Sequence, residues 1–139
     1  MPEPASPRLP RVGDRAETAH TFAAADVALF ADVSGDRNPV HLDAAYAATT
    51  RFGRPIVHGL LVSSLFSRLL AEDVPGPGTV YLSQTLAFRR PVFVGDTVTA
   101  TVEVVSVDAE RRRATLATVV ENAAGEAVVR GEAVVLVAS

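Results

Sequence analysis

Hydrophobic residues at helical spacing predict three helices in the first half of the chain. The first covers residues 23–34 and ends before Gly35, a residue type that often closes a helix in the left-handed conformation. The second is short, covers residues 44–50 and has Asp43 as its N-cap. The third covers residues 59–71 and is apolar around most of its circumference, which predicts that it is buried rather than laid on a surface.

After residue 78 the hydrophobic period changes to two, which is typical of half-buried strands. The alternation slips at Val104-Val105, which indicates a bulge. Strands are expected at about residues 80–88, 97–105, 113–121 and 127–137, with turns at 108–112 and 122–125 and a further candidate strand at 16–22. This order predicts an α+β fold, in which an antiparallel β-sheet wraps around one long central helix. Such an object is usually completed by dimerisation.

Composition narrows the class of protein further. The chain has 139 residues, of which 48% are hydrophobic and 21% charged, so it suits a folded domain with its own core. Cysteine is absent, which excludes a disulfide framework, a thiolate nucleophile and a cysteine-based metal site. Lysine is absent too, which excludes Schiff-base chemistry. The net charge is −3, whereas nucleic-acid-binding proteins usually carry a surplus of basic residues, so we expect no nucleic-acid partner.

We expect no targeting signal in the N-terminal region. Residues 1–12 hold four of the nine prolines and no hydrophobic period, so we expect a mobile or surface-hugging tail before a single domain over residues 13–139. No apolar stretch reaches the ~20 residues that a membrane span needs, and the start lacks an apolar signal-peptide region. We therefore expect a cytoplasmic protein with no membrane partner.

The stretch richest in chemistry is Ser34-Gly35-Asp36-Arg37-Asn38-Pro39-Val40-His41. An Asn-Pro turn between Asp36 and His41 can bring a carboxylate and an imidazole to face one small volume, where they can accept and donate protons near neutral pH. From spacing alone, an ordinary turn explains the same residues, because Asp, Asn, Gly and Pro are common in turns.

A second stretch, Arg54-Pro55-Ile56-Val57-His58-Gly59, directly precedes the apolar helix. The first N–H groups of a helix have no partner within it and carry partial positive charge. Because Gly59 has no side chain, a ligand oxygen can approach its N–H closely, as in an oxyanion hole. The alternative is that the glycine only allows tight packing of the helix.

Taken together, these two stretches resemble the MaoC-like (R)-specific enoyl-CoA hydratases. The first is similar to the family's hydratase 2 motif, and the segment 88–96, Phe-Arg-Arg-Pro-Val-Phe-Val-Gly-Asp, is similar to the strand and turn after the family's helix. The resemblance runs from about Val12 to the C-terminus. It implies a hot-dog fold, usually homodimeric, and reversible syn addition of water to a trans-2-enoyl thioester, giving an (R)-3-hydroxyacyl thioester.

The resemblance also implies roles for single residues. Asp36 and His41 match the catalytic dyad, and Asn38 matches a motif asparagine that holds the loop. Gly59 matches the residue whose N–H receives the thioester oxygen, and Ser67 matches a serine that hydrogen-bonds within the site. The family's reaction needs no metal and no cofactor, coenzyme A being only a part of the substrate.

Other polar residues are candidates of lower rank. Arg89 and Arg90 can meet the phosphates of coenzyme A, since guanidinium groups suit phosphate oxygens. The Arg111 cluster lies at a hairpin tip, where charges are usually solvated. For His58 we expect a structural role with a backbone partner.

Three further functions stay open on the sequence. The same chemistry serves a 3-hydroxyacyl-thioester dehydratase that acts on carrier-protein-bound substrates. A hot-dog thioesterase typically takes an acid from the central helix, and here that helix has none before Glu72. A non-catalytic acyl-thioester binding subunit would have no reason to keep Asp36 and His41 at this spacing. We therefore expect a hydro-lyase of fatty acid metabolism that acts on acyl-CoA.

Overall fold

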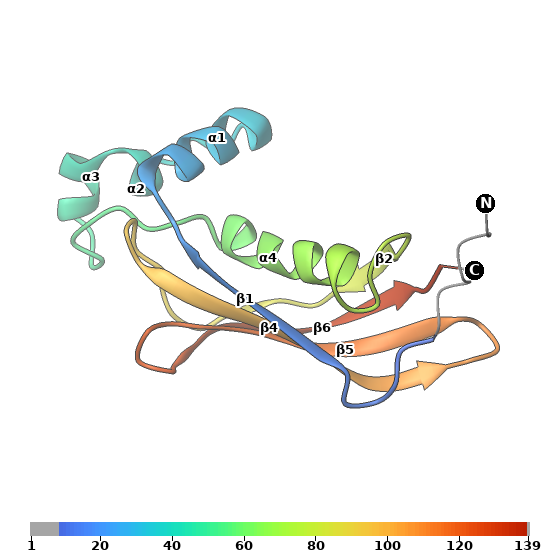
Figure 1. Ribbon diagram of the computed structural model, residues 1–139. Helices are drawn as coiled ribbons and strands as arrows, with labels where there is room; N and C mark the ends of the chain where they lie inside the picture. The colour runs from blue at the N-terminus through green and yellow to red at the C-terminus, as the bar shows by residue number, and fades with distance from the viewer. Residues whose placement is uncertain (1–8, 139) are drawn as a thin grey trace, which may run out of the picture.

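A curved, six-stranded antiparallel sheet lies against one long helix in the computed structural model, which describes residues 9–138 (Figure 1). The helices are α1 (Ala24–Ser34), α2 (Pro39–Leu42), α3 (Ala44–Ala48) and α4 (Gly59–Glu72). The strands are β1 (Arg15–Thr21), β2 (Val80–Gln84), β3 (Ala87–Phe88), β4 (Thr97–Asp108), β5 (Arg113–Glu121) and β6 (Ala127–Leu136). The strand order is β1-β4-β5-β6-β2, and β3 also pairs with β6.

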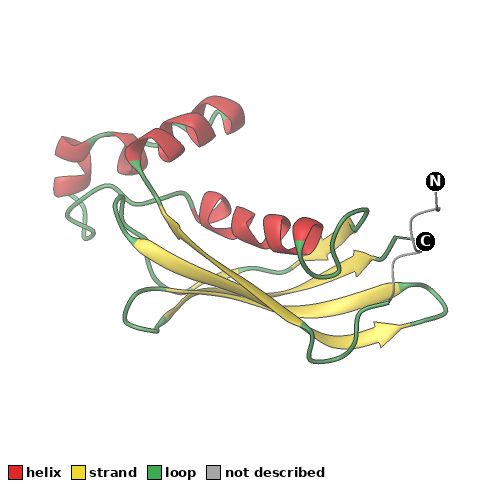
Figure 2. Cartoon of the chain, viewed as in Figure 1, coloured by secondary structure: helices red, strands yellow, loops and turns green. Residues whose placement is uncertain are grey.

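The core lies between α4 and the inner face of the sheet. Alternate residues of β4 and β5 are buried there, as the period of two predicts. One face of α4 meets them with Val62, Leu65, Phe66, Leu69 and Leu70. Full burial of a large apolar side chain stabilises a fold by roughly 1.5–3 kcal/mol, so these contacts hold the helix against the sheet. The short helices α1–α3 gather at the end of the sheet where α4 begins (Figure 2).

The α+β prediction, with its sheet around one central helix, is confirmed. The burial of that helix on all sides is not. Leu60 is 60% exposed, and Ser64, Ser67 and Arg68 are exposed on the same side of α4. The sheet of one chain covers only one face of the helix, so the apolar pattern, which includes Leu60, predicts more burial than one chain provides. The outward face of α4 is exposed.

Most predicted strands agree closely with the structure. The strand predicted at 113–121 has those bounds, and the register shifts between Val104 and Ser106, where a bulge was expected. The strand predicted at 80–88 is interrupted after Gln84. There the chain crosses Gly131 so closely that an added Cβ would lie 1.7 Å from the Thr85 carbonyl oxygen. The interruption thus depends on a glycine of another strand, which no local pattern indicates.

Hydrogen bonds tie the start of α1 to β1. The Ala23 N–H donates to Oδ2 of Asp26 at 3.0 Å, and His20 hydrogen-bonds the same oxygen at 3.1 Å. The Ala23 N–H and then His20 hold the pKa of the Asp26 carboxyl below its ordinary value. Asp26 therefore stabilises the entry of the chain into α1.

The sequence predicts a tail over residues 1–12 and a single domain over residues 13–139. Residues 1–8 of the predicted tail, and residue 139 at the end of the predicted domain, lie outside the described residues. Leu9 is half-buried and packs against the core. Within residues 9–138, no helix is long and apolar enough to cross a membrane.

Candidate active site

The motif loop between α1 and α2 is held by short-range hydrogen bonds. Gly35 ends α1 with φ 78°, and its N–H donates to the Ala31 carbonyl at 2.9 Å. The Ser34 hydroxyl donates to the Phe30 carbonyl at 2.7 Å and accepts the Asp36 N–H at 3.0 Å. These bonds turn the backbone sharply, so that Asp36 leaves the axis of α1.

Two side chains close the turn that follows. Oδ1 of Asp36 accepts the Asn38 N–H at 3.1 Å, and Oδ1 of Asn38 accepts the Val40 N–H at 3.2 Å. Asn38 is thereby the N-cap of α2, whose first residue is Pro39. One oxygen of Asp36 stays free of these bonds, and Asn38 holds the loop that carries it.

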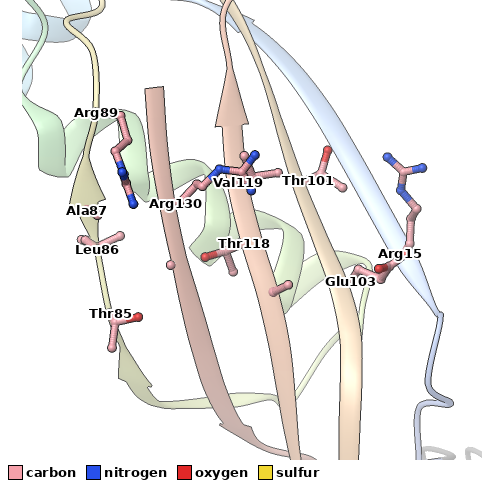
Figure 3. A pocket seen from close by; sticks show the side chains of 12 residues that line it. Arg15, Thr85, Leu86, Ala87, Arg89, Thr101, Glu103, Thr118, Val119 and Arg130 are labelled. Carbon is pink, nitrogen blue, oxygen red and sulfur yellow. The ribbon is translucent and has the colours of Figure 1, made fainter. Parts of the chain in front are cut away.

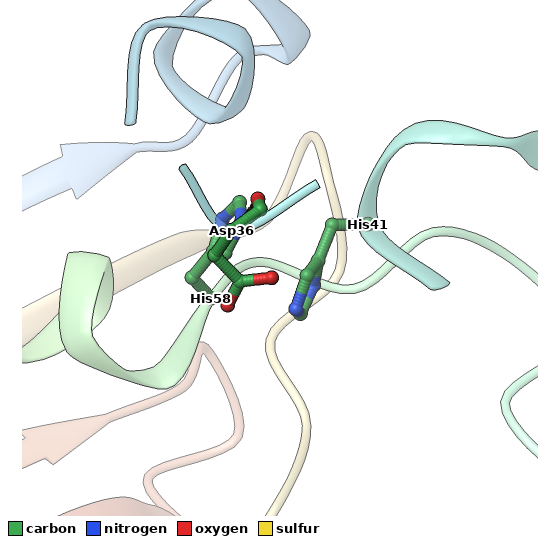
Figure 4. A group of neighbouring side chains, drawn as sticks. All are labelled: Asp36, His41 and His58. Carbon is green, nitrogen blue, oxygen red and sulfur yellow. Dashed lines mark hydrogen bonds between the residues drawn. The ribbon is translucent and has the colours of Figure 1, made fainter. Parts of the chain in front are cut away.

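His41 lies on α2 and faces Asp36. The Ile56 carbonyl lies 2.7 Å from Nδ1 of His41. Because a carbonyl only accepts, Nδ1 carries the proton and Nε2 of the neutral ring keeps its lone pair. Figure 4 shows one oxygen of the Asp36 carboxylate directed toward this ring.

The spacing of these two groups suits a bridging water. One Asp36 oxygen and one ring nitrogen each of His41 and His58 lie within 4.8 Å of one another. Two hydrogen bonds of about 2.8 Å that meet at a tetrahedral angle span about 4.6 Å. A single water can therefore bond to the carboxylate and the imidazole at once.

The third member of this group, His58, is buried, with an exposed fraction of 2%. Its Nε2–H donates to the Asp36 carbonyl at 3.0 Å, which confirms the predicted backbone partner. Its ring stacks on that of His41 with centroids 3.9 Å apart and an interplanar angle of 29°. The Phe30 ring also contacts it, at 4.7 Å between centroids.

Gly59 is the first residue of α4, so its N–H has no acceptor within the helix. Among the hydrogen bonds of residues 9–138, none uses this N–H. The Phe88 ring explains why the residue is a glycine, since an added Cβ would lie 2.6 Å from Cε1 of Phe88. Close packing and a free donor therefore occur at the same residue.

These groups line a cavity of about 400 Å³ at the start of α4. Asp36, His41, His58 and Gly59 lie on its wall. Its other lining residues are mainly apolar or aromatic, and include Phe30, Phe52, Ile56, Leu60, Val62, Phe88 and Val92. Phe30 and Phe52 are not predicted as site residues from the sequence, because single aromatic residues in a helix and a loop have no distinctive spacing.

Both predicted arginines border this cavity. Arg90 pairs with Glu126 at 3.0 Å. Arg89 is exposed and forms no ion pair with any residue of the described chain. It also borders a larger hollow of about 580 Å³ on the outer face of the sheet, where Arg15 and Arg130 lie (Figure 3). That hollow contains none of the motif residues, so the smaller cavity is the candidate site.

Ser67 does not reach the cavity within this chain. It lies on the exposed side of α4, two turns beyond Gly59, and borders a separate hollow of about 300 Å³. Tyr81 and Gln84 border the same hollow, and the Tyr81 hydroxyl donates to the Gln84 side chain. Tyr81 as a whole is 39% exposed, but partial burial raises the pKa of its hydroxyl to about 12. The structure therefore unites Asp36, Asn38, His41 and Gly59, but not Ser67.

Asp36, His41 and His58 are also the types of residue that bind metals. The two imidazole rings stack with an interplanar angle of 29°, and each has one nitrogen in a hydrogen bond to a backbone carbonyl. The second nitrogen of His41 and the second oxygen of Asp36 are the groups that can exchange protons in the cavity.

A curved sheet around one helix, with a carboxylate and an imidazole at the start of that helix, defines a hot-dog protein of the hydratase type. The chain belongs to the family of MaoC-like domains, whose model matches residues 10–126.

Two relatives and one solved structure illustrate the similarity. The chain is 54% identical to the (R)-specific enoyl-CoA hydratase of Aeromonas caviae, over 89% of this chain and 92% of the relative. It is 50% identical to a 3-hydroxybutyryl-CoA dehydratase of Methylorubrum extorquens, over 84% and 73%. The solved structure of an (R)-hydratase from A. caviae superposes with a TM-score of 0.90 at 53% identity, covering 91% of this chain and 96% of that one.

Proposed function

We propose that this chain is an (R)-specific enoyl-CoA hydratase. It is a hydro-lyase that adds water reversibly to trans-2-enoyl-CoA and gives (R)-3-hydroxyacyl-CoA. The observation that carries the proposal is the cavity in which the Asp36 carboxylate faces His41 beside the free N–H of Gly59. The identity of 54% to an (R)-specific enoyl-CoA hydratase supports it.

The Gly59 N–H activates the substrate. It receives the thioester oxygen, on which negative charge builds as water adds, and thereby makes carbon 3 more electrophilic. The donor stands at a helix start, where the backbone already carries partial positive charge. Loss of one such donor typically costs on the order of 10²–10³-fold in kcat.

Asp36 and His41 carry the proton transfers. A water between them loses a proton to the pair while its hydroxyl oxygen bonds to carbon 3. The pair returns one proton to carbon 2, so the double bond becomes single and the pair ends unchanged. Because the Nδ1–H of His41 is bonded to Ile56, Nε2 is the nitrogen that exchanges a proton. Both groups act from one side of the double bond, which gives syn addition.

We propose that the reaction uses no metal and no cofactor, with coenzyme A entering only as part of the substrate. Every bond change above is accounted for by the pair and the Gly59 N–H. For the phosphates of coenzyme A we propose Arg89, since it borders the cavity without an ion-pair partner among residues 9–138. Arg90 has a smaller role, because Glu126 already occupies its guanidinium group.

The proposed assembly is a homodimer. Strand β2 is the last strand of the sheet order, so one of its edges has no strand beside it. Its Val80, Tyr81 and Leu82 are exposed, and so is Leu60 on the outward face of α4. A second copy that covers this surface would bury apolar area and also complete the hollow that contains Ser67.

The proposed metabolic role and cellular location follow from the proposed substrate. An acyl-CoA substrate supports a role in fatty acid metabolism, and we propose the cytoplasm as the location. A hot-dog thioesterase is less well supported, because the only acid of α4 is Glu72, its last residue.

The test uses purified protein and crotonyl-CoA, with absorbance followed at the enoyl-thioester band. The product is then offered to an (R)-specific and to an (S)-specific 3-hydroxyacyl-CoA dehydrogenase. We expect loss of absorbance and oxidation by the (R)-specific enzyme alone. Faster turnover of the crotonyl group on a carrier protein would favour the dehydratase alternative, and release of free thiol would favour a thioesterase. No turnover on either carrier at any chain length would indicate a binding subunit.

A further inference from the structure

His58 contacts both members of the candidate pair. It donates a hydrogen bond from Nε2 to the Asp36 carbonyl at 3.0 Å, and its ring lies 3.9 Å from that of His41. No other residue of the described chain joins the two in this way. The sequence places His58 directly before a predicted helix, and from that position only a structural role is predicted for it.

The hydrogen bond fixes the backbone of Asp36. The loop from Gly35 to Asn38 is exposed, and its short-range hydrogen bonds use the Asp36 N–H and carboxylate but not the Asp36 carbonyl. A buried donor at the N-cap of the central helix holds that carbonyl in place. Because the carbonyl and the carboxylate belong to one residue, the bond also limits the directions in which the carboxylate can point.

The stack fixes the plane of His41. The Ile56 carbonyl holds one atom of that ring, which still permits a tilt about the hydrogen bond. The face of His58 removes this tilt, and the contact between Phe30 and His58 supports the stacking ring in turn. Nε2 of His41 then keeps one direction in the cavity.

The residue type at position 58 indicates that both a ring and a hydrogen-bond donor are needed there. Nδ1 of His58 is buried and has no hydrogen-bond partner in the described chain. A buried polar atom without a partner is unfavourable, and a side chain that only filled space would be apolar. A phenylalanine would supply the ring without the donor, and a glutamine would supply the donor without the ring. Histidine supplies both at the expense of one unsatisfied nitrogen.

We propose that His58 is a positioning residue that aligns Asp36 and His41 through these two contacts. The inference rests on the proposed hydratase function. Misplacement of a reacting group by about 1 Å can cost on the order of 10²-fold in rate. The contribution of His58 is therefore expected in kcat.

The kinetic test compares His58→Phe, which keeps the ring, with His58→Gln, which keeps the donor. On crotonyl-CoA we expect each variant to lower kcat by at least about tenfold, with KM within about threefold of wild type. His20→Gln is the matched control, because His20 lies outside the cavity, and it should keep the wild-type kcat. A folded His58→Phe protein with wild-type kcat would show that the side chain only fills space, and would overturn the proposal.

A second readout needs no substrate. The chain has three histidines, so ¹⁵N-histidine NMR can assign the ring nitrogens of each by comparison with the variants. In wild type we expect His41 as the Nδ1–H tautomer and His58 as the Nε2–H tautomer. In His58→Gln the unstacked His41 ring is free to tilt about its hydrogen bond to Ile56, so its ring signals should broaden. An unchanged His41 spectrum would overturn the proposal even with an active enzyme, whereas an inactive wild type with the expected spectra would refute only the hydratase function.

Discussion

The substitution Gly59→Ala tests how the start of α4 serves the site. The new Cβ would lie 2.6 Å from Cε1 and 2.8 Å from Cδ1 of Phe88. The ring must therefore move by about 0.8 Å to reach an ordinary contact of 3.4 Å. Phe88 is 55% exposed, so its side chain can swing toward solvent. A side chain displaced from its rotamer costs roughly 0.5–1.5 kcal/mol. Gly59 has no positive φ, so alanine fits its backbone and, by restricting the unfolded chain, recovers about 0.4–1 kcal/mol.

The two contributions nearly cancel, so the variant should fold. We expect its Tm, measured by circular dichroism, to lie within about 4 °C of wild type, which corresponds to about 1 kcal/mol for a domain of this size. Activity should respond much more strongly. The displaced ring and the new methyl group both stand beside the Gly59 N–H, so kcat/KM for crotonyl-CoA should fall on the order of 10²-fold.

Two further variants test whether the Phe88 ring causes the loss of activity in Gly59→Ala. In a Phe88→Ala background the ring is gone, so adding Gly59→Ala should lower kcat/KM by much less than in wild type. Gly131→Ala is the contrast, because its Cβ would meet the Thr85 backbone oxygen at 1.7 Å, and backbone cannot swing away. That variant should be destabilised by more than about 4 kcal/mol. Wild-type activity in Gly59→Ala, or a loss as large without the Phe88 ring, would refute the account.

Three other predictions follow from single features of the structure. Arg89→Ala should raise the KM for crotonyl-CoA about tenfold with kcat nearly unchanged, as expected for a lost phosphate contact, while Arg111→Ala at the far hairpin leaves both unchanged. The lowered pKa of Asp26 stabilises the fold above the ordinary pKa of 3.8, and this contribution is lost as pH falls through the lower folded-state value. Thermal melts between pH 6 and pH 2 should therefore show a smaller loss of Tm in Asp26→Asn than in wild type, and an equal loss would contradict the assignment. Leu82→Asp should dissociate the proposed homodimer in sedimentation experiments, whereas Val105→Asp, equally exposed at 43%, should leave it intact.

The sequence predicts those parts of the fold that depend on local pattern. The strand at 113–121 and the bulge after Val104 follow from a period of two and its interruption. Helix α1 follows from its apolar spacing and from Gly35. Helix α2 was missed, because four residues are too few to show a period. The interruption of the strand after Gln84 was also missed, since its cause is a contact with Gly131 more than forty residues away.

In the candidate site, too, the sequence predicts the relations that depend on local pattern and misses those that depend on distant contacts. The motif indicates that Asp36 and His41 face one volume, because a short turn determines their relation. The contacts of His58 depend on how α4 docks against the loop, which no spacing in the sequence encodes. Ser67 is assigned to the site by resemblance alone, and within one chain it lies at another hollow.

The most direct test of the proposed chemistry is the hydration of crotonyl-CoA by wild type and by Asp36→Asn. Asparagine keeps an oxygen that can accept the Asn38 N–H, and the position is exposed, so the variant should melt as wild type does. It removes the carboxylate that faces His41. The account predicts rapid loss of absorbance at the enoyl-thioester band with wild type and a rate at least about 10²-fold lower with the variant. A folded Asp36→Asn protein that hydrates crotonyl-CoA at the wild-type rate would contradict it.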